Sequence, residues 1–139
     1  LASEDVGNAD PMALVMATSA LQAVSFIGFP EAQLTLSQVT SYLATAPKSN
    51  ASTVAIMKAR KLVDSGTLYS VPAHLKDSHY KGAKRMGYGE GYQSSHNDPT
   101  GIAPQSYMPE IHTFYEPVDR GYEATIRKRL EKIRPRLQS

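Results

Sequence analysis

The chain has 139 residues, about the size of one domain, and it contains no cysteine, which excludes a disulfide framework and a thiolate zinc site. No charged-then-apolar leader is visible. The longest apolar run, Met12 to Ile27, is too short and too interrupted by polar residues to span a bilayer. We therefore expect a cytoplasmic protein without a membrane partner.

Charge is divided unevenly along the chain. Residues 1–47 contain four acidic residues and no Lys or Arg, whereas residues 48–139 hold all fifteen Lys and Arg with nine acidic residues. The formal net charge of +2 therefore hides an acidic first third and a basic remainder. Such a division is typical of separate faces for protein contacts and for anions, and it equally fits apolar helices followed by solvated ones.

The first expected helix follows Asp10-Pro11, with Asp10 as its cap and Pro11 in the first helical position. It runs to about Ile27, and Gly28 suits its C-terminal cap. This helix is apolar on nearly every side. A helix of this kind is buried nearly all round, which favours either a central helix or a helix in a subunit interface.

The second helix is expected to run to Ala46, where Pro47 stops it and pushes Ala46 toward extended geometry. Thr35 and Gln38 fit a capping box at its start. Ser49 or Asn50 then caps a third helix, expected over residues 51–65 and ending at Gly66.

The last helix is expected over residues 121–134, with Glu123 and Arg127 as a favourable pair four residues apart. Pro135 should end or kink it. The sequence thus predicts a mainly α fold, a single domain with three parts. These are a helical bundle at 1–66, an irregular wrap at 67–118 and a C-terminal helix at 119–139.

The predicted wrap combines five prolines with six tyrosines and shows neither helical nor strand periodicity. Disordered segments are poor in aromatic residues, so we expect an ordered, irregular, Tyr/Gly/Pro-rich segment over the bundle. A brief strand pairing near Tyr69 or Phe114 is also expected.

The glycine-rich loop 82–91 does not match a phosphate-binding motif. A P-loop needs Lys followed by Ser or Thr after its second glycine, and Tyr88 and Gly89 stand there instead. A dinucleotide fingerprint fails on its glycine spacing. We expect no catalytic, cofactor-binding or ATP-binding residue in this chain.

The four histidines, His74, His79, His96 and His112, show no metal-ligand spacing, and no metal site is expected. His96 lies two residues from Asp98, which leaves open a small enzyme that uses this pair.

Cations and aromatic rings alternate in the basic loop, which we define as residues 76–92. Single-stranded nucleic acids are bound by such mixtures, because cations follow the phosphates and rings stack on bases. The alternative is a turn-rich loop with its tyrosines packed inward. The candidate DNA-binding residues are Lys81, Lys84, Arg85, Tyr88 and Tyr92.

The amino-acid sequences of several short stretches resemble those of a known family. Tyr42–Asn50 reads Tyr-Leu-Ala-Thr-Ala-Pro-Lys-Ser-Asn, and five further stretches occur in the family's order: Ala2–Pro11, Val71–Asp77, Tyr80–Tyr92, Tyr107–Glu110 and Tyr115–Glu123. Together they resemble the C-terminal domain of the replication-associated recombination ATPases (RarA/MgsA). These are AAA+ proteins related to clamp loaders and to the Werner-helicase-interacting protein. One departure is the run Ser94–Asp98, where the family usually carries an aromatic-Pro-His run.

The resemblance implies the oligomerising collar of a clamp-loader-like ATPase that acts in DNA replication, recombination and repair. It implies a bacterial, nucleoid-associated homotetramer, with ATP and Mg²⁺ bound elsewhere in the full-length protein. Expected partners are other copies of the chain, single-stranded or forked DNA bound weakly, and single-stranded-DNA-binding protein. A DNA- or partner-binding module working through the basic loop is the alternative. The expected interface residues are Met12, Val15, Met16, Phe26 and Phe29.

Overall fold

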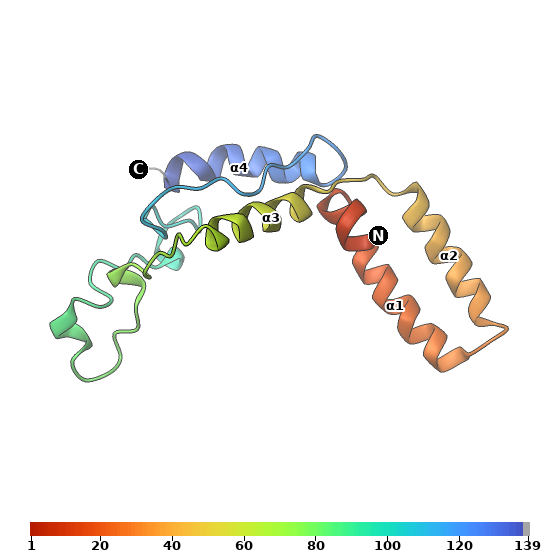
Figure 1. Ribbon diagram of the computed structural model, residues 1–139, viewed down its shortest axis with the longest axis horizontal. Coiled ribbons are helices and arrows are strands. Elements are labelled where there is room, and N and C mark those ends of the chain that lie inside the picture. Colours follow the sequence, from red (N-terminus) through yellow and green to blue (C-terminus); the bar gives the residue numbers. More distant parts are fainter. Residues whose placement is uncertain (138–139) are drawn as a thin grey trace. The chain divides into compact units, whose positions relative to one another are not determined.

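The computed structural model describes residues 1–137 and is helical, with no strand in that range (Figure 1). The predicted mainly α class is confirmed, whereas the predicted strand pairing near Tyr69 or Phe114 is wrong. The four longer helices are α1 (Met12–Ile27), α2 (Ala32–Thr45), α3 (Ala51–Asp64) and α4 (Glu123–Leu137). Short helical turns occupy Ala2–Val6, Gly7–Ala9, Ala73–Leu75, Ala83–Met86 and Ser95–Asn97.

The chain divides into two compact units. The first unit comprises residues 1–61 and 114–128, and the second comprises residues 62–113 and the chain from residue 129 onward. The boundaries fall inside α3 and inside α4. The predicted single domain with parts 1–66, 67–118 and 119–139 stays a prediction, and the last two residues of that third part lie outside the described residues.

In the first unit, α1 packs beside α2 (Figure 1). Asp10 fixes this pair at one end, because its Oδ1 accepts the Met12 N–H at 3.1 Å and its Oδ2 accepts the Tyr42 hydroxyl at 2.6 Å. At the other end of α1, Gly28 has φ 74° and its N–H donates to the Val24 carbonyl. The predicted start and end of this helix are confirmed.

The start of α2 differs from the prediction. The helix begins at Ala32, so the capping box at Thr35 and Gln38 is wrong, and both residues lie inside the helix. The reason is that the N–H groups of residues 32–34 already donate to the carbonyls of residues 28, 30 and 31. The end of α2 is as predicted, since Ala46 is extended at φ −60° and ψ 145°.

Polar contacts connect α3 to the N-terminal segment. Ser49 Oγ accepts the Ala51 N–H at 3.2 Å and caps the helix. In the first turn of α3, Ser52 Oγ accepts from the Asn8 side-chain amide and the Thr53 hydroxyl donates to the Glu4 carbonyl. Within the first unit the close helix-to-helix packing joins α1 and α2, and α3 does not lie along them. The packing therefore differs in this respect from a three-helix bundle.

A buried carboxylate joins these elements. Glu123 is fully buried, and its oxygens accept hydrogen bonds from Ser49 Oγ at 2.8 Å, the Tyr115 hydroxyl at 2.9 Å and the Val118 N–H at 2.8 Å. The predicted pair of Glu123 with Arg127 stays a prediction. A buried carboxylate is stable only when its oxygens are hydrogen-bonded, and three donors meet that requirement here.

Close backbone approach surrounds this carboxylate. Gly121 has φ 54°, and a Cβ at this position would lie 2.0 Å from the Ala9 carbonyl oxygen. The next N–H, that of Tyr122, donates to that same oxygen at 2.8 Å. Only glycine fits this contact.

The C-terminal helix continues past its proline. Pro135 lies inside α4, which runs to Leu137, so the helix does not end at residue 134, and the alternative of a kink at Pro135 stays a prediction. A proline near a helix end removes only one intrahelical hydrogen bond. Arg136, beyond it, donates to Asp98 Oδ2 at 2.6 Å, a contact within the second unit.

Removing the Glu123 carboxylate should destabilise the protein strongly. Glu123→Ala removes the acceptor of the buried Ser49 hydroxyl and of the half-buried Tyr115 and Val118 donors, and we expect the free energy of unfolding to fall by about 3 kcal/mol. Glu90→Ala, at an exposed carboxylate, should change it by less than about 0.5 kcal/mol. Urea denaturation followed by circular dichroism measures both, and equal stability of the two variants would contradict the role of Glu123.

Candidate functional site

The basic loop folds back on itself around glycines. Gly82 at φ 100° and Gly87 at φ 67° bracket the turn Ala83–Met86, whose Ala83 is fully buried. Gly89 donates its N–H to the Ala73 carbonyl at 2.9 Å, and a Cβ at residue 89 would lie 2.7 Å from the Ser78 side chain. The glycines therefore serve tight turns and close packing.

The loop presents its cations to solvent. Lys81, Lys84 and Arg85 are all exposed. Within residues 1–137, no hydrogen bond or ion pair is recorded for these three side chains. Their charges are therefore available to a phosphate.

The two candidate stacking residues differ in environment. Tyr88 is half-buried, with Lys76 Nζ 4.8 Å above its ring centroid and the Tyr80 ring edge-on at 6.4 Å. These two neighbours limit access to the Tyr88 ring. Tyr92 is 56% exposed and is the more accessible of the two rings.

The loop also bears on nucleotide binding. Tyr88, which stands where a P-loop carries its lysine, packs on Lys76 and Tyr80. Neither the sequence nor this geometry fits a cradle for ATP and Mg²⁺.

The structure does not bring His96 and Asp98 into a catalytic pair. Asp98 Oδ1 accepts hydrogen bonds from the N–H and hydroxyl of Thr100, and Oδ2 accepts from Arg136. Hydrogen bonds from Thr100, reinforced by the Arg136 charge, lower the pKa of Asp98 below its ordinary value of 3.8. The backbone N–H of His96 donates to Ser94 Oγ, so its recorded contact is with Ser94.

The other histidines have separate partners. His74 bonds the Ser106 carbonyl at 2.8 Å, and His79 bonds Asp77 at 2.7 Å. In the part of the chain that the structure describes, no three His, Asp or Glu side chains gather into a metal-binding group.

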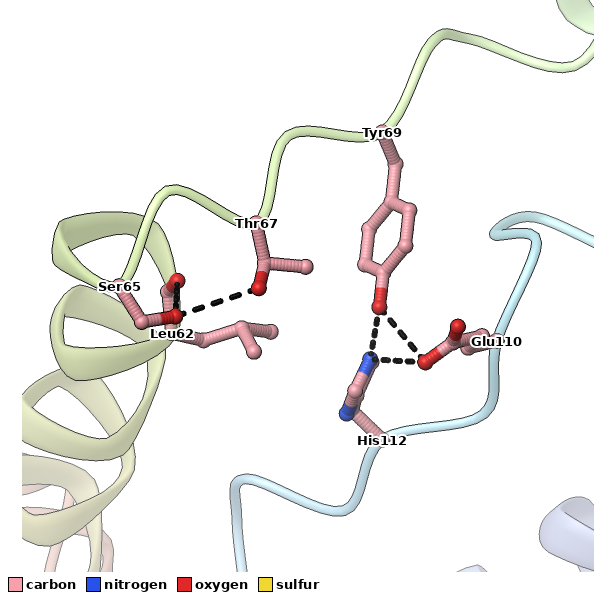
Figure 2. Close-up of polar contacts among 6 residues, drawn as sticks. All are labelled: Leu62, Ser65, Thr67, Tyr69, Glu110 and His112. Carbon is pink, nitrogen blue, oxygen red and sulfur yellow. Dashed lines mark hydrogen bonds and ion pairs between the residues drawn. The ribbon is translucent and has the colours of Figure 1, made fainter.

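Sequence reasoning missed a cluster at the two ends of the irregular segment. The Tyr69 hydroxyl lies 2.8 Å from both Glu110 Oε2 and His112 Nε2 (Figure 2). The hydrogen bond to Glu110, then desolvation, raises the pKa of Tyr69 above 10.0. No local motif signals this contact, because the partners are about forty residues apart.

The predicted interface helix is exposed in the isolated chain. Of α1, only Ala13 and Ala20 are buried, so the alternative of a central helix is wrong and the alternative of an interface helix stays a prediction. The exposed fractions of four predicted interface residues are 51% for Met12, 53% for Val15, 92% for Phe26 and 69% for Phe29, and Met16 is half-buried. Other exposed large apolar residues of the α1–α2 pair are Leu14, Leu21, Ile27, Leu34 and Leu36.

The family model described as "MgsA AAA+ ATPase C terminal" matches residues 1–134. The chain belongs to this family. It is 36% identical to the replication-associated recombination protein A of Bacillus subtilis, over 98% of this chain and 33% of that protein. It is also 49% identical to an AAA domain-containing protein of Mycobacterium tuberculosis, over 96% of this chain and 30% of that protein.

A eukaryotic relative is also similar. The chain is 40% identical to the ATPase WRNIP1 of Dictyostelium discoideum, over 79% of this chain and 13% of that protein. The chain thus spans at most about a third of the length of these curated relatives. The resemblance to the C-terminal domain of the recombination ATPases is confirmed. Among the described residues, no helix has the length and hydropathy of a membrane span.

The Tyr69 cluster predicts a change in alkaline titration. Because the hydrogen bond to Glu110 stabilises the protonated tyrosine, this contact contributes stability below pH 10.0, and the contribution is lost as pH rises through the pKa of the folded state. Glu110→Gln should move the pKa of Tyr69 down toward 10.0. Nuclear magnetic resonance of labelled tyrosine follows the titration. Glu90→Gln is the control, and an unchanged Tyr69 pKa in Glu110→Gln would contradict the assignment.

Proposed function

We propose that this chain is the oligomerising collar of a clamp-loader-like AAA+ ATPase. The observation that carries the proposal is the exposed apolar surface of the α1–α2 pair, where Phe26 is 92% exposed. Contiguous apolar patches of large size are rare on monomeric proteins and mark sites of association. The family relationship supports the same reading.

The charge pattern is compatible with association. The residues up to 47, which include α1 and α2, carry only four charged side chains, all acidic. Few charges therefore need to be desolvated when the apolar surface is covered. The proposed occupant is a second copy of the same surface, and the proposed assembly is a homotetramer.

The proposed mechanism is mechanical. The collar holds ATPase modules together, and nucleotide-driven motion of those modules is applied to DNA during replication-fork maintenance, recombination and repair. ATP and Mg²⁺ belong to the remaining part of the longer protein, as in an AAA+ ATPase. The proposed location is the bacterial cytoplasm at the nucleoid, with single-stranded-DNA-binding protein as a partner.

Self-association is the test of the collar. The chain should sediment as an oligomer, a tetramer by this proposal, at tens of micromolar. Phe26→Glu places a charge on the apolar surface and should shift the protein to monomers with little change in its fold, because the ring packs on little in the isolated chain. Ile111→Glu, 65% exposed in the second unit, is the matched control and should leave the oligomer intact. A wild-type monomer under these conditions would contradict the proposal.

A second candidate function is weak DNA binding by the basic loop. The specific observation is that Lys81, Lys84 and Arg85 are exposed and form no hydrogen bond or ion pair with any side chain within residues 1–137. Phosphate contacts of this kind do not depend on sequence and weaken steeply with salt. An oligomer multiplies a weak site by raising its effective concentration.

Substitution of two cations tests this candidate. Lys84→Ala with Arg85→Ala should reduce affinity for single-stranded or forked DNA and reduce the slope of log K against log salt by about one per lost contact. Replacing Lys58 with Ala, which removes a cation already paired with Glu116, is the control. Fluorescence anisotropy over a salt series measures both quantities. Unchanged binding in the double variant would assign any DNA contact to another surface.

A further inference from the structure

The second unit contains an open hollow that the proposed collar does not use. Its volume is about 360 Å³, within the range of small-ligand pockets. Its lining includes Tyr92, Ser94, Asn97, Asp98, Ala103 and Pro104. All of these residues lie in one unit, between residue 92 at the end of the basic loop and residue 104.

Hydrogen bonds hold the walls of the hollow in place. The Gln105 side chain accepts the Gln93 N–H at 3.0 Å and donates to the Gln93 carbonyl at 2.9 Å. On the opposite stretch of the lining, Ser94 caps the turn Ser95–Asn97, and Asp98 is bonded to Thr100 and Arg136. A site whose walls are held before binding loses less entropy when a ligand enters.

The lining offers an aromatic face and a polar edge together. Tyr92 is 56% exposed, and Ala103, which is 1% exposed, adds a small apolar surface. Asn97 is exposed, and its side-chain amide carries one acceptor and two donors. The Ser94 hydroxyl already accepts from His96 and keeps its own proton to donate. A flat heterocycle with donors and acceptors on its edge matches this set.

The charged group that lines the hollow suits a nucleobase better than a phosphate. The Asp98 carboxylate lines it, and hydrogen bonds from Thr100 and the charge of Arg136 hold its pKa low, so it is ionised at neutral pH. A carboxylate offers no hydrogen-bond donor to a phosphate, and it accepts from the exocyclic amine of a base. The cations that suit phosphate, Lys81, Lys84 and Arg85, precede the hollow in the same unit.

We propose that this hollow takes one unpaired nucleobase of a DNA single strand, with the Tyr92 ring stacking on the base and the Asn97 amide bonding its edge. Unpaired bases are recognised in this way, by stacking on aromatic rings and hydrogen bonding along the base edge. The inference rests on the DNA-binding candidate above and is independent of the collar.

The test compares two strands and four variants of the full chain. One probe is a short single-stranded oligodeoxyadenylate, and the other is the same strand with abasic sites in place of the bases. Tyr92→Ala should weaken binding of the base-bearing strand about tenfold and leave the salt slope unchanged, because stacking is lost and no phosphate contact is. Tyr92→Phe should retain affinity, Asn97→Ala should lose about threefold, and the abasic strand should not distinguish Tyr92→Ala from wild type.

The Lys84→Ala/Arg85→Ala variant separates the two ways of failing. If it weakens binding while Tyr92→Ala and Asn97→Ala do not, DNA binding stands and the base site is overturned. If wild type binds neither strand at low salt, the DNA-binding candidate fails and this inference fails with it. Saturable micromolar binding of free deoxyadenosine monophosphate would assign the hollow to a mononucleotide and would overturn the proposal that it takes a base of a DNA single strand.

Discussion

The buried Glu123 carboxylate is the interaction on which the first unit depends. It accepts hydrogen bonds from the cap residue of α3, from Tyr115 and from the backbone at Val118, and it stands at the first residue of α4. Elements that are distant in sequence therefore share one acceptor. A carboxylate out of water is costly unless it is fully hydrogen-bonded, so the segments that carry Ser49, Tyr115, Val118 and Glu123 must come together for the carboxylate to be buried. Loss of one donor also weakens the hydrogen bonds that the other donors make to Glu123.

The same carboxylate orders its surroundings. Tyr115 both donates to Glu123 and accepts from Asn8, and its burial raises the pKa of its hydroxyl, so the neutral phenol persists beyond its ordinary range. The close contact of Gly121 with the Ala9 carbonyl adds a steric constraint beside it. The N-terminal ten residues are thus fixed to the start of α4. In the proposed collar, this attachment is where movement of a preceding ATPase module would reach the helices.

Local chemistry made the helices predictable, and long-range contacts account for what the sequence did not show. Asp10, Gly28, Pro47 and Ser49 act within one helical turn of their own position, and the helix limits that depend on them are as predicted. Glu123 looks like any first-turn acid until Ser49, 74 residues away, supplies its donor. The exposed cations of the basic loop were visible in the sequence. The inward packing of Tyr88 and the hollow beside Tyr92 were not, because both depend on folding of an aperiodic segment.

The distribution of apolar side chains favours association over a self-sufficient fold. Among residues 1–137, the buried apolar side chains are Val6 and seven alanines, and an alanine contributes little apolar area. Larger groups such as Phe26, Leu21 and Leu34 remain mostly exposed on the α1–α2 pair. Burial of apolar area is the main favourable term in folding, at roughly 25 cal/mol per Å². A chain that leaves Phe26 and Phe29 mostly in water and buries a carboxylate instead gains most of its remaining apolar stabilisation only when another molecule covers that surface. In the proposed assembly, oligomerisation and stability are therefore coupled, and the stability of the α1–α2 pair should rise with protein concentration.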